Sequence, residues 1–216
     1  MSFDALAQHY RWMEAVLAGP RLQRCRTAWL DELHGCRDIL IAGVGHGPFL
    51  ARATQRLPQA RITAVDASAG MLREARRRAE RSGIGENRIQ FIHATLPAWR
   101  PSAAAFDAIV THFFLDCFAP AELREVISSL AAATRPAARW LLADFTVPAR
   151  GLARQRARAV HALMYGFFRR ATKLRARRVT EPDGLLAAEG FALVRRQTSE
   201  WGLLHSDLWV RQRARS

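Results

Sequence analysis

The sequence predicts an α/β fold: a doubly wound, mostly parallel sheet of seven strands with helices on both faces. Short apolar runs of strand length alternate with segments whose apolar residues recur every three or four positions, as in amphipathic helices. The last two apolar runs, 191–199 and 204–212, have a short connection and should therefore pair antiparallel. The 216 residues suit one domain, and 50% of them are hydrophobic, which is enough for a sizeable core.

The elements are expected in a regular order along the chain. A helical segment opens the sequence and breaks at Gly19-Pro20 before a second helix resumes. Strands and helices then alternate, and a long helix from 151 to about 170 and a short helix over 183–189 precede the antiparallel pair. The expected strands are 38–42, 61–65 (ending on Asp66), 89–94, 106–111 and 139–145, and the helices between them are 48–57, 68–82 and 121–134.

We expect the whole chain, 1–216, to form one domain with four parts. These are N-terminal helices over 1–35, a cofactor-binding core over 36–147, a basic lid or insertion helix over 148–180, and a C-terminal helix with antiparallel strands over 181–216. The core is expected to carry the chemistry, because it holds the alternating strands and helices.

The charge and cysteine content narrow the class of protein. Lys and Arg number 33 against 19 Asp and Glu, a net charge of +14, and Lys173 is the only lysine. An excess made of arginine fits a coding background rich in G and C as well as it fits a phosphate-binding surface. The three cysteines show no paired spacing, so neither a disulfide framework nor a metal site is expected. The N-terminus lacks a secretory signal pattern, and no apolar run is long enough for a membrane helix; a cytoplasmic protein is expected.

A glycine-rich turn and an acid at the next strand end point to a nucleotide-type cofactor. The first strand runs into Gly43-Val44-Gly45-His46-Gly47, and the second strand ends on Asp66, 23 residues after Gly43. Glycines allow close approach of a ligand to the backbone, and a carboxylate at this strand end can accept both ribose hydroxyls. Dinucleotide binding requires G-x-G-x-x-G, but the sixth position here is Pro48. A cofactor without a pyrophosphate is therefore favoured.

With these motifs in order, the sequence resembles the class I S-adenosylmethionine-dependent methyltransferases, particularly small ones related to quinone-biosynthesis methyltransferases. The resemblance covers nearly the whole chain, including the antiparallel pair that ends it. The segments that carry it are Phe3–Tyr10, Ile39–Gly47, Val65–Leu72 and Phe106–Thr111. The resemblance implies a Rossmann-like fold and S-adenosyl-L-methionine as the cofactor.

Carried over by position, the resemblance implies a cofactor site around the glycine turn. It implies these contacts: Gly43, Gly45 and Gly47 along the methionine and ribose, Asp66 on the ribose hydroxyls, Ala67 and Met71 flanking the adenine, Ala94 and Thr95 at its edge, and Thr111 and Phe113 under the sulfonium. Tyr10 is a further candidate, folding over the cofactor from the N-terminal helix; the favoured alternative is a buried tyrosine on that helix face. Two positions depart from the family's pattern, because Ile41 and Thr95 stand where the family commonly has acids.

Several side chains are candidates for the acceptor chemistry. Methyl transfer depends mainly on positioning, and a base is needed only if the acceptor must lose a proton. His112 and Asp116 follow the fourth strand, so His112 is the candidate base and Asp116 its orienting or substrate-binding partner; the alternative is that both serve packing. Tyr165 and His205 are candidate substrate contacts. His205 and Asp207 share one face of a strand, and the pattern favours an exposed polar face for them.

The segment from 148 to 180 holds ten basic residues and no acid. An apolar stripe beside them, which includes Val160, Leu163 and Phe167, makes a basic amphipathic element. Its simplest interpretation is a solvated cover helix. A lid that contacts an anionic membrane surface is the second interpretation. Nucleic acid is the least favoured partner, because the aromatic residues lie on the apolar stripe rather than among the arginines.

The sequence thus predicts a methyltransferase of small-molecule biosynthesis that uses S-adenosyl-L-methionine on a small, hydrophobic or aromatic acceptor. Oxygen is the favoured receiving atom and carbon the second. Two alternatives stay open: a non-catalytic module that binds the cofactor, and an NAD(P)-dependent reductase, against which Pro48 argues. The acceptor and the oligomeric state are not encoded in spacing.

Overall fold

The predicted seven-stranded sheet is present in the computed structural model, which describes residues 19–82, 86–146, 148, 150–151, 154–155 and 182–212. The strands are β1 (Asp38–Ala42), β2 (Arg61–Asp66), β3 (Ile89–His93), β4 (Phe106–His112), β5 (Thr134–Phe145), β6 (Phe191–Ser199) and β7 (Leu204–Arg211). The helices are α2 (Gly19–Thr27), α3 (Pro48–Arg56), α4 (Ala69–Arg81), α5 (Pro120–Ala132) and α7 (Asp183–Ala188), and short 3-10 turns cover Leu30–Leu33, Glu86–Arg88, Leu115–Cys117 and Glu200–Gly202.

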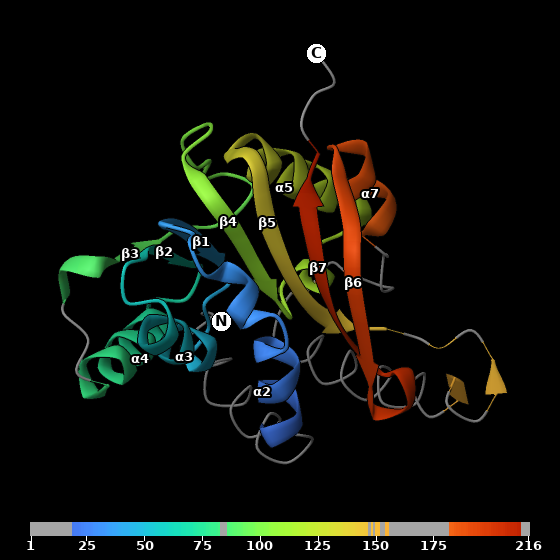
Figure 1. Cartoon of the computed structure of the whole chain (residues 1–216), viewed down its shortest axis with the longest axis horizontal. Coiled ribbons are helices and arrows are strands. Elements are labelled where there is room, and N and C mark those ends of the chain that lie inside the picture. Colours follow the sequence, from blue (N-terminus) through green and yellow to red (C-terminus); the bar gives the residue numbers. More distant parts are fainter. Residues whose placement is uncertain are drawn as a thin grey trace.

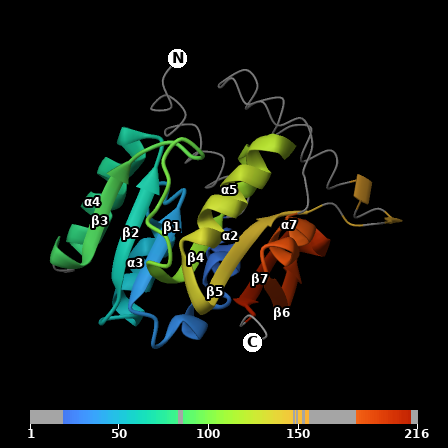
Figure 2. The same ribbon diagram turned by 90° about the horizontal axis from the view of Figure 1, so that it is seen from above.

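The strand order confirms a doubly wound, Rossmann-like arrangement. It is β3-β2-β1-β4-β5-β7-β6, with the neighbouring pairs from β3 to β5 parallel and both pairs of β7 antiparallel. The order reverses between β1 and β4, where the carboxyl ends of the strands leave the usual ligand position of an open α/β sheet. Figures 1 and 2 show β6 and β7 at the end of the sheet opposite β3.

Helices cover both faces of the sheet (Figures 1 and 2), and each face has its own apolar core. On one face, α3 and α4 pack through Phe49, Leu50 and Leu72, and α2 joins them beside β5 and β7. On the other face, α5 and α7 pack on the fully buried Trp140 of β5. The central strands are apolar on both sides, which is why β1 reads as a continuous run rather than an alternating one.

The element boundaries differ most from the prediction at the start of β5. The predicted helix to Thr134 ends at Ala132, and the strand begins at Thr134 rather than Arg139. Arg135 forms ion pairs with Asp38 at 3.0 Å and with Asp107 at 2.8 Å, which fix the start of β5 beside β1 and β4. Apolar periodicity cannot indicate this boundary, because the surrounding alanines suit a helix or a strand.

Two predicted segments fall wholly or mostly outside the described residues. They are the first helical part, 1–18, and the basic helix expected from 151 to about 170. Gly19 and Pro20, which were expected to separate two helices, are the first residues of α2. Within the part of the chain that the structure describes, no helix is long and apolar enough to cross a membrane.

Candidate functional site

The glycine turn joins the carboxyl end of β1 to α3 and is held against β2. The N–H groups of Gly43 and Val44 both donate to the Val65 carbonyl, at 2.9 and 3.1 Å. Gly43 leaves no room for a side chain, since a Cβ there would lie 2.3 Å from Cδ2 of Phe114. Gly47 has φ of +80° and packs on α4, where a Cβ would lie 2.9 Å from the Cα of Ala75. The turn therefore needs glycine for close packing as well as for its backbone conformation.

Asp66 ends β2 and reaches the glycine turn. Its Oδ2 accepts a hydrogen bond from the Gly45 N–H at 2.8 Å, and its Oδ1 accepts one from the Ser68 N–H at 2.9 Å. Burial raises the pKa of Asp66, and the two N–H donors oppose that rise. Each carboxylate oxygen has a second lone pair, so this side chain is fixed in orientation while it can still accept hydroxyl groups of a ligand.

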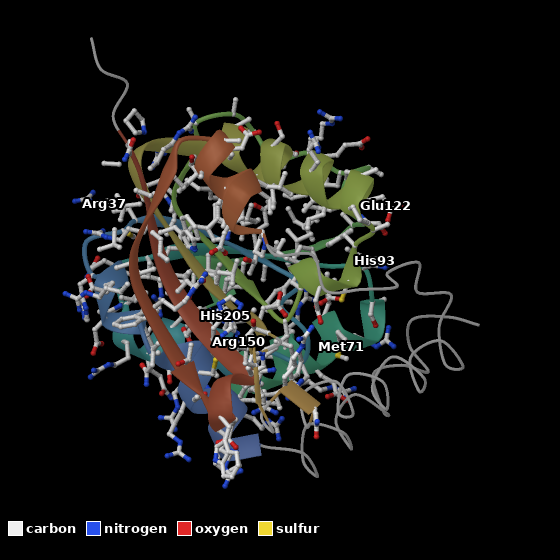
Figure 3. The ribbon with its side chains drawn as sticks, turned by 90° about the vertical axis from the view of Figure 1, so that its right-hand side faces the viewer. Arg37, Met71, His93, Glu122, Arg150 and His205 are labelled. Carbon is white, nitrogen blue, oxygen red and sulfur yellow. The ribbon has the colours of Figure 1, made fainter. Side chains whose placement is uncertain are left out.

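The residues predicted to contact the adenine follow β2 and β3. Met71 is buried on α4, Ala67 and Ala94 are half-buried, and the Ala94 N–H donates to the Asp66 carbonyl at 3.1 Å. Thr95 is exposed. His93, at the end of β3, places its Nε2 3.0 Å from the Ala67 carbonyl; Figure 3 labels His93 and Met71.

The end of β4 carries two residues that the resemblance placed under the sulfonium. The Thr111 hydroxyl is buried and accepts a hydrogen bond from Nε1 of Trp140 at 2.9 Å, so it faces the α5 core. Phe113 has φ of +53°, an uncommon conformation for a residue with a side chain. Its ring packs 5.0 Å from that of Phe145, and the Arg26 guanidinium lies 5.1 Å from its centroid.

His112 is buried on the α3 face of β4. Its ring meets Phe49 edge-on at 4.6 Å, it is 9% exposed, and neither ring nitrogen has a hydrogen-bond partner among the described residues. Burial and the nearby positive charge of Arg26 lower the pKa of His112 to about 3. The imidazole is therefore neutral at neutral pH and weakly basic. Asp116 does not orient His112 through a hydrogen bond, and its substrate-binding role stays a prediction.

Asp116 instead lies near a second acid, Asp144, at the end of β5. Burial raises the pKa of Asp116 to about 6, and burial together with the charge of Asp116 raises the pKa of Asp144 well above its ordinary value. Asp144 Oδ1 accepts from the Phe145 N–H at 2.8 Å, and Cys117 Sγ donates to Asp116 Oδ1 at 3.6 Å. Asp144 was not among the sequence candidates. Its signal is the one that identified Asp66, an acid at the carboxyl end of an apolar strand.

His205 and Asp207 share one face of β7, as predicted, but the expected exposed face is wrong. His205 is 6% exposed and Asp207 is fully buried. The reason is that β7 lies inside the sheet between β5 and β6, and α7 supplies Asp183 to the same cluster through Arg196. Alternation in a strand indicates which residues share a face, but not whether that face is covered. Tyr10 and Tyr165 lie outside the described residues.

Comparison with known proteins agrees with this geometry. Residues 39–137 match the model of a methyltransferase domain family. A trans-aconitate 2-methyltransferase from Rhodopseudomonas palustris is 35% identical over 96 residues, which are 44% of this chain and 34% of that protein. A release factor glutamine methyltransferase from Chlorobaculum tepidum is 46% identical over 73 residues, which are 34% of this chain and 24% of that protein. The match thus spans about a third or less of the length of these curated relatives.

Solved structures show the same fold. Magnesium protoporphyrin IX methyltransferase from Synechocystis, with bound S-adenosylhomocysteine, has a TM-score of 0.70 at 19% identity, covering 97% of this chain and 96% of that one. 1,6-Didemethyltoxoflavin-N1-methyltransferase from Burkholderia thailandensis, with the same product bound, has a TM-score of 0.67 at 21% identity, covering 97% and 88%.

Residues 39–137 thus match a methyltransferase domain, and the fold is shared with methyltransferases whose structures hold S-adenosylhomocysteine. The predicted Rossmann-like fold is confirmed, and both findings agree with the predicted class I methyltransferase. The names of the similar proteins give acceptors as different as trans-aconitate, a release-factor glutamine and magnesium protoporphyrin IX. Neither the acceptor nor the relation to quinone-biosynthesis enzymes follows from these comparisons.

Proposed function

We propose that the chain is an S-adenosyl-L-methionine-dependent methyltransferase of a small, hydrophobic or aromatic acceptor, with oxygen the favoured receiving atom and carbon the second. One observation carries the cofactor part. The glycine turn and the acid at the end of β2 form a single unit, because Gly45 N–H donates to Asp66 Oδ2 at 2.8 Å. A ribose held by Asp66 would be placed directly beside the backbone of the turn.

The cofactor would extend from the end of β3 to the end of β4 along this unit. Asp66 would accept the ribose hydroxyls, Met71 and Ala67 would flank the adenine, and Ala94 with Thr95 would meet its edge. The methionine part would lie over Gly43, Gly45 and Gly47. The backbone from Thr111 to Phe113 would lie under the sulfonium, since the Thr111 hydroxyl is already bonded to Trp140.

Aromatic side chains at the ends of β4 and β5 support the proposed acceptor class. Phe113 packs on Phe145 and Phe114 on Phe118, each pair with ring centroids 5.0 Å apart. Flat apolar acceptors pack well on such rings. His112 would serve this site as a neutral hydrogen-bonding group, because its pKa of about 3 makes it a poor proton acceptor.

The direct test is calorimetric titration of the purified protein with S-adenosylhomocysteine. We expect stoichiometric binding, and at least a tenfold weaker Kd in Asp66→Ala, because the ribose hydroxyls lose their acceptor. Asp31→Ala is the matched control, since Asp31 pairs with Arg56 at the surface and lies away from the glycine turn. The absence of binding in the unmodified protein, or equal binding by Asp66→Ala, would contradict the proposal.

The acceptor class is tested separately with a panel of phenols, aromatic amines and aromatic carbon nucleophiles, by following release of S-adenosylhomocysteine. We expect turnover with phenols. Cofactor binding without turnover of any acceptor would favour the alternative of a non-catalytic module.

A further inference from the structure

The inference concerns His205 and the charged side chains that hold it. His205 Nδ1 lies 2.9 Å from Oδ2 of Asp207. A carboxylate only accepts hydrogen bonds, so Nδ1 is the donor and Nε2 carries the lone pair of the neutral ring. A histidine fixed in this tautomer presents its remote nitrogen as a proton acceptor. This is how a carboxylate prepares an imidazole base in enzymes that require one.

Asp207 is in turn held rigidly. Arg196 donates to it twice, from Nε to Oδ1 at 2.8 Å and from Nη2 to Oδ2 at 2.6 Å. The same Nη2 reaches Asp183 of α7 at 2.9 Å. Burial would raise the pKa of Asp207, but the bonds from Arg196 and His205 lower it below its ordinary value. The carboxylate is therefore ionised at neutral pH and able to stabilise a positive charge on the imidazole.

The position of His205 in the sheet places it at the reaction edge. His205 is the second residue of β7 and pairs with Asp144, the last residue but one of β5. The adjacent residue of β5, Ala143, pairs with His112 at the end of β4. His205 and His112 thus stand two strand spacings apart, about 10 Å along the sheet, and because Ala143 and Asp144 are consecutive, the two side chains project to opposite faces of the sheet. Figure 3 labels His205 within the packed side chains.

We propose that His205, positioned by Asp207 and Arg196, is the base that takes the proton from a hydroxyl acceptor. The proposal rests on the proposed function and narrows the acceptor to one that must lose a proton. The acceptor O–H gives its proton to Nε2 as the oxygen lone pair bonds to the methyl carbon of S-adenosyl-L-methionine. The carbon–sulfur bond breaks with its electron pair on sulfur, giving neutral S-adenosylhomocysteine, and the imidazolium then loses its proton to solvent.

Of His112 and His205, only His205 has the environment of a base. His112 has a neighbouring cation, Arg26, and no carboxylate partner, whereas His205 has an ionised carboxylate on its own strand. The other groups near His205 are Asp144 on β5 and the Cys25 thiol on α2, which donates to the His205 carbonyl and has a pKa raised to about 12 by burial. Arg26 of α2 is a nearby cation, since its charge acts on the Cys25 thiol.

The test compares His205→Gln with His34→Gln, a matched change at an exposed histidine outside the site. Glutamine keeps a hydrogen bond to Asp207 but cannot take up a proton. We expect His205→Gln to lower kcat with a phenolic acceptor by about 10²–10⁴-fold, to leave S-adenosylhomocysteine binding unchanged, and to remove the fall in rate at acidic pH. His34→Gln should behave as the unmodified protein.

Asp207→Asn tests the positioning role with the same readouts. We expect a loss of about tenfold or more in kcat at unchanged cofactor affinity, and a double variant no worse than His205→Gln alone, because the two residues act as one unit. Thermal melting of each variant separates loss of fold from loss of chemistry. Full activity and an unchanged pH profile in folded His205→Gln would overturn this proposal alone, whereas failure of the unmodified protein to bind cofactor would overturn the proposed function.

Discussion

The two halves of the sheet prepare their chemistry in different ways. From β3 to β4, the proposed cofactor contacts come mostly from backbone, and Asp66 accepts hydrogen bonds from two N–H groups that lie close to strand ends. From β5 to β6, a chain of charged side chains joins β6, β7 and α7 through Asp207 and Arg196. The first half is local and common to many cofactor-binding sheets. The second is long-range, because its residues come from β6, β7 and α7, and it holds the residue that we propose as the base.

The largest effect is expected from removing Asp207, the carboxylate that binds both Arg196 and His205. Asp207→Ala should lower the free energy of unfolding by about 3 kcal/mol, because it leaves Arg196 and His205 without their buried carboxylate. The figure lies at the low end for buried pairs, since Arg196 is a third exposed and keeps Asp183. Urea unfolding measures it, and Asp31→Ala, at an exposed ion pair, should cost less than about 1 kcal/mol.

The difference in stability between the unmodified protein and Asp207→Ala should depend on pH. The pKa of Asp207 is lowered from 3.8 in the folded state, so its contribution is complete above that value and is lost as pH falls through the lower folded value. The free energies of unfolding of the unmodified protein and of Asp207→Ala should therefore differ by the full amount at pH 7 and become similar below about pH 4. A difference that stays constant down to pH 2 would mean that Asp207 stabilises the fold by packing rather than by its ion pairs with Arg196 and His205.

The half of the sheet from β3 to β4 is tested by adding one methyl group to the glycine turn. Gly47→Ala should lower the free energy of unfolding by about 2 kcal/mol, because its Cβ would meet the Ala75 backbone at 2.9 Å and its φ is +80°. Gly45→Ala is the matched control. Its Cβ would meet nothing within 4 Å, so only the cost of its positive φ, about 1 kcal/mol, remains. Equal losses in the two variants would show that close packing on α4 does not matter.

The contrast between local and long-range contacts explains which parts of the site could be predicted from the sequence. The sheet, the glycine turn and Asp66 were predictable, because a strand, its turn and the following acid are read from consecutive residues. The charged cluster was not predictable, because Arg196 meets Asp207 and Asp183 only once β6 pairs with β7 and α7 packs beside β6. Asp144 carries the same local signal as Asp66, and only its proximity to Asp116, which comes from another strand end, depends on the fold. The chemical environment of His112 likewise depended on Arg26 of a separate helix.

The smallest expected effect is at the acidic pair where the two halves meet. Asp116 has a folded pKa of about 6 against an ordinary 3.8, raised by burial, so the protein loses stability as pH rises through 6 and Asp116 ionises. Asp116→Asn cannot ionise at this position, so its stability should not fall in this way. We expect the variant to be more stable than the unmodified protein at pH 7.5 by about 1 kcal/mol, after allowing for partial solvent screening, and equal to it at pH 4. Thermal melting across this range measures the difference. Asp31→Asn, at the surface, should show no such crossing, and a variant that is less stable at pH 7.5 would mean that the ionised Asp116 stabilises the fold.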